Sequence, residues 1–151
     1  MIALVLAFDF GTRRIGVASG DTLTCAARPL TTLHYAGATP WAAVDRVLTD
    51  YSAQQLVVGV PYNMDGSETA LTLPSLEFAA ALAARTALPV ALVDETLSSR
   101  EAETELKTAR AQGLKKRRVT HGDVDRIAAK VILQRWFDQG MPANRPLQPG
   151  K

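Results

Sequence analysis

Apolar runs separated by turn residues divide the first part of the chain into strands. Residues 4–8, LVLAF, are too continuously apolar for a strand with one wet face, which predicts a strand covered on both faces in the middle of a sheet. After a turn at Gly11, residues 14–20 are predicted to form the returning strand of a hairpin. Residues 23–33 read as a third antiparallel strand, in which Pro29 indicates an edge position, where a missing backbone donor is tolerated.

Helical spacing then alternates with two further buried strands. Thr39 and Pro40 predict a helix start, as N-cap and first helical residue. The apolar run at residues 54–60 follows that helix, so we expect a right-handed crossover that sets this strand parallel to the first one. A helix over about residues 71–86 leads to a last strand at residues 89–93, PVALV. The chain is therefore predicted to be an α/β protein.

The segment beyond the last strand is predicted to be helical. A polar helix should end at Gly113, and a final amphipathic helix should cover residues 123–139. Asp123 is expected to be the N-cap of the final helix. Asp125 lies in its first turn on the side that carries Ala128 and Ile132, and this side should face the core.

Composition and length indicate one globular domain. A chain of 151 residues is long enough to bury a core. Its composition, 47% hydrophobic and 21% charged, is that of an ordinary globular protein. We expect the domain to span residues 1–139 and the proline-rich residues 140–151 to form a disordered tail. The single Cys25 fits a reducing compartment, and we find neither a signal peptide nor an apolar run of about 20 residues. These features predict a soluble, cytoplasmic protein that does not enter a membrane.

Positive charge is concentrated near the final helix. The net charge is only +2, but seven of the 17 Lys and Arg residues lie between Arg100 and Arg118. The densest run is Lys115, Lys116, Arg117 and Arg118. Such a run is by default a solvated loop, and the alternative is a loop that contacts phosphates of a nucleic acid.

Acidic residues follow the ends of two core strands. Asp9 ends the first apolar run, and Asp94 and Glu95 directly follow the last one. A buried carboxylate needs a partner or a cation, although Asp9 alone could equally cap the turn at Gly11. Together with Asp125, these acids outline a site without His or Cys, which favours Mg²⁺ or Mn²⁺. Asp94 and Glu95 could instead complement a helix dipole.

Four segments resemble, in order, the signature blocks of the RuvX/YqgF family of Holliday junction resolvases. They are FDFGTRRIGVA, VVGVPYNMDGS, VDETLSSREAE and VDRIAAKVILQRWFD. The resemblance implies a ribonuclease-H-like fold with a five-stranded mixed sheet of order 3-2-1-4-5. It also implies metal-dependent nuclease chemistry on branched DNA or RNA, including, for part of the family, the maturation of pre-ribosomal RNA. By motif position, Asp9, Glu95 and Asp125 take the catalytic and metal-binding roles.

The expected partner is nucleic acid, and a homodimer stays an open alternative. We expect contacts to nucleic acid from the basic run and from two loops, that is, from Arg13, Arg14, Asn63, Lys115, Lys116, Arg117 and Arg118. Asp94 and His121 are auxiliary candidates. The chain departs from the family pattern at Thr96, where the family usually has Arg, and this puts a phosphate-holding role there in doubt.

Two other functions compete with the nuclease. The D-x-G-T motif at Asp9 also resembles the phosphate loop of actin-like ATPases, but those proteins close on ATP between two such domains and this chain supplies one. A non-catalytic RNA-binding assembly factor could use the basic surface. In such a factor, three acidic groups that face the core would have no physical purpose.

Overall fold

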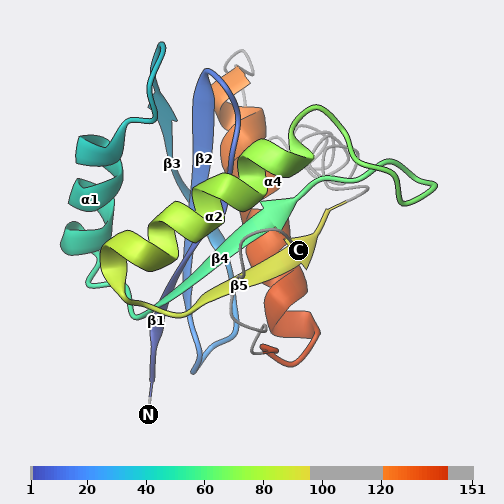
Figure 1. Cartoon of the computed structure of the whole chain (residues 1–151). Helices are drawn as coiled ribbons and strands as arrows, with labels where there is room; N and C mark the ends of the chain where they lie inside the picture. The colour runs from blue at the N-terminus through green and yellow to red at the C-terminus, as the bar shows by residue number, and fades with distance from the viewer. Residues whose placement is uncertain (1, 96–120, 143–151) are drawn as a thin grey trace, which may run out of the picture.

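A computed structural model describes residues 2–95 and 121–142 of the chain. In these ranges the chain forms a five-stranded sheet with helices on both faces (Figure 1). The elements in chain order are β1 (Leu4–Asp9), β2 (Arg14–Asp21), β3 (Arg28–His34), α1 (Trp41–Asp50), β4 (Gln55–Val60), α2 (Thr72–Thr86), β5 (Val90–Asp94) and α4 (His121–Asp138).

The sheet is mixed, and its strand order is β3-β2-β1-β4-β5. β1 pairs antiparallel with β2, and β2 pairs antiparallel with β3. β4 lies parallel to β1 on one side and to β5 on the other. The predicted fold class and strand order are confirmed, as is the parallel crossover through α1.

Alternation of side chains along β1 explains why its whole apolar run is buried. Successive side chains of a strand point to opposite faces of the sheet. Leu6 and Phe8 pack on the face covered by α1 and α2, whereas Val5 and Ala7 pack on the face covered by α4 (Figure 1). All four residues are almost fully buried, so the sequence correctly predicted a central, two-sided strand.

One helix covers the second face among the described residues. α4 contacts every strand of the sheet, and it does so through its apolar side. Ala129, Ile132, Leu133 and Trp136 are almost fully buried there. This helix therefore fixes the position of any side chain that it carries relative to the ends of the strands.

The third strand begins later than predicted. Residues 22–24 form a turn after β2, in which the carboxylate of Asp21 accepts the N–H groups of Leu23 and Thr24. Cys25 follows in the left-handed region, with φ at 53°, so the prediction of a strand there is wrong. Pro29 does lie in the edge strand β3, where it pairs with Ala18 beside a shift of register.

Both predicted N-caps are wrong. α1 begins at Trp41, one residue later than expected, with Pro40 at the N-cap and no side-chain capping bond. α4 begins at His121, so Asp123 lies inside its first turn. The side chain of Asp123 is 0% exposed and forms an ion pair with Arg126, three residues along the helix. This residue therefore lies inside the helix, and its carboxylate pairs with a cation there.

Residues 140–142, which follow α4, contact the helix and the core. Gly140 and Met141 close the end of α4 through backbone bonds, and Met141 packs against the core. The indole Nε1 of Trp136 donates to the carbonyl of Pro142 at 3.1 Å. Residues 143–151 lie outside the described residues, as do the predicted polar helix and the basic run. No helix in the described ranges has the length and apolarity needed to cross a bilayer.

Candidate active site

Strand alternation brings Asp9 and Glu95 to the same face of the sheet. Asp9 lies two residues after Ala7, and Glu95 lies two residues after Val93. Ala7 and Val93 both pack on the face covered by α4. The two acids therefore lie on that face too, at the carboxyl ends of β1 and β5. Because β4 runs parallel between these strands, the two ends meet at one edge of the sheet.

The same alternation separates Asp94 from the site. Asp94 pairs with Val60 at the end of β5 and is exposed, and it is one residue out of phase with Glu95. Arg135 of α4 holds this strand end by donating from Nη1 to the carbonyl of Asp94 at 2.7 Å. The structure therefore places Glu95, which is 7% exposed, beside Asp9 and does not place Asp94 there.

Asp125 reaches this edge because Gly16 lets α4 approach the sheet closely. Gly16 is the partner of Asp9 in the β1–β2 ladder. A Cβ atom at Gly16 would lie 2.0 Å from the carbonyl oxygen of Asp125, so the helix backbone passes directly over this glycine. A glycine inside a strand often marks such a close approach of two backbones. Gly16 thus sets how near Asp125 comes to Asp9.

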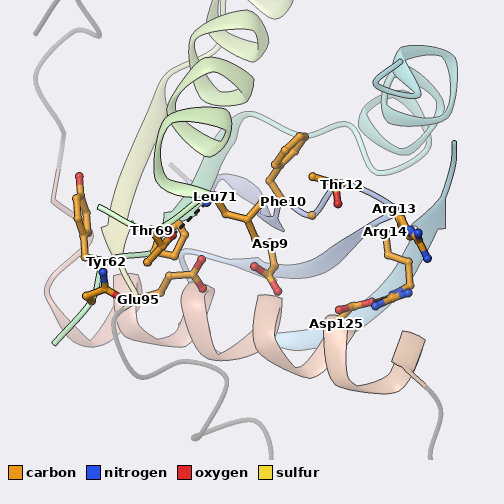
Figure 2. Close-up of a pocket in the computed structure, with 13 residues that line it drawn as sticks. Asp9, Phe10, Thr12, Arg13, Arg14, Tyr62, Thr69, Leu71, Glu95 and Asp125 are labelled. Atoms are coloured by element: carbon orange, nitrogen blue, oxygen red, sulfur yellow. Dashed lines mark hydrogen bonds and ion pairs between the residues drawn. The ribbon is translucent and has the colours of Figure 1, made fainter. Parts of the chain in front are cut away.

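The three acids line one cavity of about 530 Å³. In Figure 2, Asp9 lies between the other two, with Glu95 on one side and Asp125 on the other. The remaining lining residues come from the β1–β2 turn and from the loop between β4 and α2. They are Phe10, Gly11, Thr12, Arg13, Arg14, Pro61, Tyr62, Asn63, Thr69 and Leu71.

The acids repel one another at the centre of the site. The pKa of Asp9 is raised well above its ordinary value of 3.8, chiefly because surrounding protein removes water from its carboxyl group. The negative charges of Glu95 and then Asp125 raise it further, and so does a side-chain hydrogen bond with Glu95. Part of Asp9 still faces the cavity. A cation placed there would relieve both the repulsion and the desolvation.

Arg14 holds the third acid. Its Nε donates to Oδ2 of Asp125 at 2.7 Å, and the two side chains are 33% and 21% exposed (Figure 2). Within residues 2–95 and 121–142, no three His, Cys, Asp or Glu side chains are gathered closely enough to hold one metal ion. The oxygen donors suit Mg²⁺ or Mn²⁺ by their chemistry, but Oδ2 of Asp125 is bound to Arg14.

The other predicted contact residues have different surroundings. Arg13 is exposed at the rim of the cavity. Asn63 also lines the cavity, but its amide nitrogen donates to the Ser67 hydroxyl at 3.0 Å and so braces its own loop. His121 is the first residue of α4. The basic run from Lys115 to Arg118 lies outside the described residues.

Residues that the sequence interpretation missed hold the two loops of the site. The hydroxyl of Tyr35 donates to the carbonyl of Gly11, and its backbone N–H donates to the carbonyl of Arg13 at 3.0 Å. The buried hydroxyl of Thr72 donates to the carbonyl of Pro61. No local pattern signals these bonds, since each partner is a backbone carbonyl of a loop distant in the sequence.

Gly59 lies near the end of β4, next to the place that Glu95 occupies. A Cβ atom there would lie 2.9 Å from Cδ of Glu95 and 2.4 Å from Cδ1 of Ile132. The missing side chain therefore makes room for Glu95 between β4 and α4. An isolated glycine within an apolar strand was the available signal for both Gly16 and Gly59.

Similar solved structures define the class of fold. The chain resembles Thermus thermophilus RuvC, solved in complex with a Holliday junction substrate, with a TM-score of 0.59 and 19% identity over 96% of this chain and 99% of that one. It also resembles the yeast mitochondrial Holliday junction resolvase Ydc2, with a TM-score of 0.50 and 12% identity over 88% and 77% of the two chains. This is the ribonuclease-H-like fold of the RuvC-type resolvases.

Sequence comparison then gives the family. The model described as "RuvX: Holliday junction resolvase" matches residues 3–139. A protein of Dechloromonas aromatica is 40% identical over 89% of this chain and 90% of its own length. One of Legionella pneumophila is 43% identical over 89% and 94%. Both relatives carry the name "Putative pre-16S rRNA nuclease". The chain belongs to the RuvX family, and the predicted resemblance is confirmed.

Proposed function

We propose that this RuvX-family chain is a divalent-metal-dependent nuclease that hydrolyses phosphodiester bonds in structured nucleic acid. One observation carries the proposal: three acids from β1, the end of β5 and α4 line a single open cavity, although they repel one another there. Acids that repel one another are not gathered in one place for the sake of stability. A divalent cation would offset this repulsion, and it could in turn bind a phosphate oxygen of the substrate.

Asp9, Glu95 and Asp125 are the residues that would hold the cation. A bound Mg²⁺ or Mn²⁺ would activate a water molecule and stabilise the leaving oxygen of the phosphodiester. The described residues contribute the rest of the site. The wall on which Glu95 lies is fixed by Gly59 and Arg135, and the β1–β2 turn is fixed by Tyr35.

Two kinds of substrate follow from the comparisons. The relatives are named for pre-16S rRNA, and the T. thermophilus RuvC structure contains a Holliday junction. For this chain we propose structured RNA of the ribosomal precursor type as the first substrate, because the relatives share about 40% identity over nearly its whole length. A four-way DNA junction is the second.

The test is cleavage of a panel of substrates with Mg²⁺, with Mn²⁺ and with a chelator. The panel should hold a pre-16S rRNA fragment, a four-way junction, a DNA duplex and single-stranded DNA. We expect Asp9→Asn and Glu95→Gln to abolish metal-dependent cleavage. Asp94→Asn is the matched control, because this neighbouring acid lies out of phase with Glu95 at the same strand end.

Cleavage that survives the chelator, or that Asp9→Asn leaves unchanged, would contradict the proposal. Metal-independent binding without cleavage of any substrate would favour the RNA-binding assembly factor. Equal losses in Asp94→Asn and Glu95→Gln would show that the variants act through general charge and not through the geometry of the site.

A further inference from the structure

The ion pair between Arg14 and Asp125 occupies an acid that the proposed metal site needs. Arg14 begins β2 and Asp125 lies on α4, 111 residues later, so the pair joins the sheet to the helix across the cavity. The Nε to Oδ2 distance of 2.7 Å is that of a strong, charge-assisted hydrogen bond. The contact is therefore a specific one and not a loose surface pairing.

Two observations suggest competition between this pair and a bound cation for Oδ2 of Asp125. With the pair formed, no three acidic, His or Cys side chains among the described residues are gathered as ligands of one ion. In addition, the guanidinium of Arg14 is a permanent positive charge at the cavity wall and would repel a second cation nearby. The pair engages Oδ2 of Asp125, so this oxygen can bind a cation beside Asp9 only when it leaves Arg14.

We propose that Arg14 is a positioning residue that serves as the internal counter-ion of Asp125 and competes with the divalent cation for its carboxylate. This inference rests on the proposed metal-dependent function. When Asp125 joins Asp9 and Glu95, Arg14 loses its partner while it still lines the cavity. Its guanidinium is then available to a phosphate group of the substrate, so one residue serves the cation-free site and the substrate-bound site in turn.

A stabilising role would predict the opposite effect on metal affinity. Carboxylates that bind metals are often oriented by hydrogen bonds from neighbouring groups, and removing such a group weakens metal binding. If Arg14 only orients Asp125, its loss must lower the affinity for the cation. If it competes, its loss must raise that affinity. The sign of one measured change separates the two roles.

The experiment measures Mn²⁺ binding to the full chain, without nucleic acid, by electron paramagnetic resonance. We expect Arg14→Gln to bind Mn²⁺ about two- to fivefold more tightly than the wild type, as expected for the loss of one partly exposed ion pair. Arg14→Lys should lie between the two proteins. Arg13→Gln is the matched control, because it removes the same charge from the same cavity but leaves the Arg14–Asp125 pair intact.

A second measurement needs no destabilising variant. In the wild type, the Nε–H resonance of Arg14, assigned by its absence from Arg14→Lys, should move toward the position of a free guanidinium as Mg²⁺ is added. In an Asp125→Asn background, Arg14→Gln should change Mn²⁺ affinity no more than Arg13→Gln does.

Weaker Mn²⁺ binding by Arg14→Gln, or a gain no larger than that of Arg13→Gln, would overturn the inference and leave the proposed nuclease intact. An Nε–H resonance that does not move at saturating Mg²⁺ would also overturn it. If neither the wild type nor Arg14→Gln bound Mn²⁺, that result would contradict both the proposed metal dependence and this inference.

Discussion

The Asp9 carboxyl group links the chemistry of the site to the stability of the fold. Its pKa is raised in the folded protein, so the folded state binds this proton more tightly than the unfolded chain does. As the pH rises through the interval between the two pKa values, the folded state must release the proton at a cost. Asp9 therefore lowers stability above that interval and is harmless below it.

We expect Asp9→Asn to unfold at a higher urea concentration than the wild type at neutral pH. The gap between the two proteins should shrink as the pH falls to about 3 and below, where the carboxyl group is largely protonated in both states. Urea titrations at several pH values, without added metal, measure the gap. A variant that is less stable at every pH would instead show that Asp9 caps the turn at Gly11.

Asp123 and Asp125 should behave oppositely although they are two residues apart. Asp123 is almost fully buried and is paired with Arg126, so Asp123→Ala should destabilise the protein by about 1–3 kcal/mol. Asp125→Asn should cost little stability and abolish cleavage. Thermal denaturation and the cleavage assay, run on both variants, check this prediction. Loss of cleavage in well-folded Asp123→Ala would contradict it.

Sequence patterns were most informative for single residues on strands. Strict alternation after an apolar run is enough to put Asp9 and Glu95 on one face, and the sequence predicted both acids. The partner of Asp125 could not be predicted in this way. Arg14 lies 111 residues away, and their contact depends on how α4 lies on the sheet, which no local pattern encodes.

At the level of elements, the approach of α4 to β2 decides whether the site forms. Gly16→Ala would place a methyl group against the backbone of Asp125, so the helix must shift. We expect a loss of about 1–3 kcal/mol in stability, as for other overpacked positions, together with a loss of cleavage. Denaturation and cleavage should be measured on the same preparation.

Gly20→Ala provides the matched control on the same strand. A Cβ atom there would lie 2.8 Å from the Ala26 carbonyl and 2.9 Å from the Phe137 ring, near the far end of α4. We expect a comparable loss of stability with cleavage retained at temperatures where the protein is folded. Equal loss of cleavage in both variants would mean that stability alone, and not the position of Asp125, explains the effect of Gly16→Ala.

The elements themselves were largely predictable, and their ends were not. Continuous or helical apolar spacing located every strand and helix of the described ranges. The start of β3 was missed because Leu23 and Thr24 fit a strand pattern, while the Asp21 carboxylate binds their N–H groups and forms a turn. The start of α4 was missed because Asp123 fits an N-cap pattern, although burial beside Arg126 gives it another role.

For the whole molecule, we predict that the basic run adjacent to α4 supplies affinity for nucleic acid. Each phosphate that a protein neutralises on duplex DNA contributes about −0.9 to the slope of log K against log salt. Replacing Lys115, Lys116, Arg117 and Arg118 by Ser should flatten the slope by about two to four units. Binding titrations at several salt concentrations measure it. An unchanged slope would move the substrate path to Arg13 and the loop at Asn63.

Because α4 is the last described element of the chain, its acid joins the site after the acids of the sheet have been synthesised. All four strand pairings of the sheet can form once β5 has been synthesised. One face of the sheet then still lacks the covering side chains Ile132, Leu133 and Trp136. A chain that ends before α4 would carry Asp9 and Glu95 at the ends of β1 and β5 and still lack Asp125. Docking of α4 closes the apolar face and delivers the third acid in the same event.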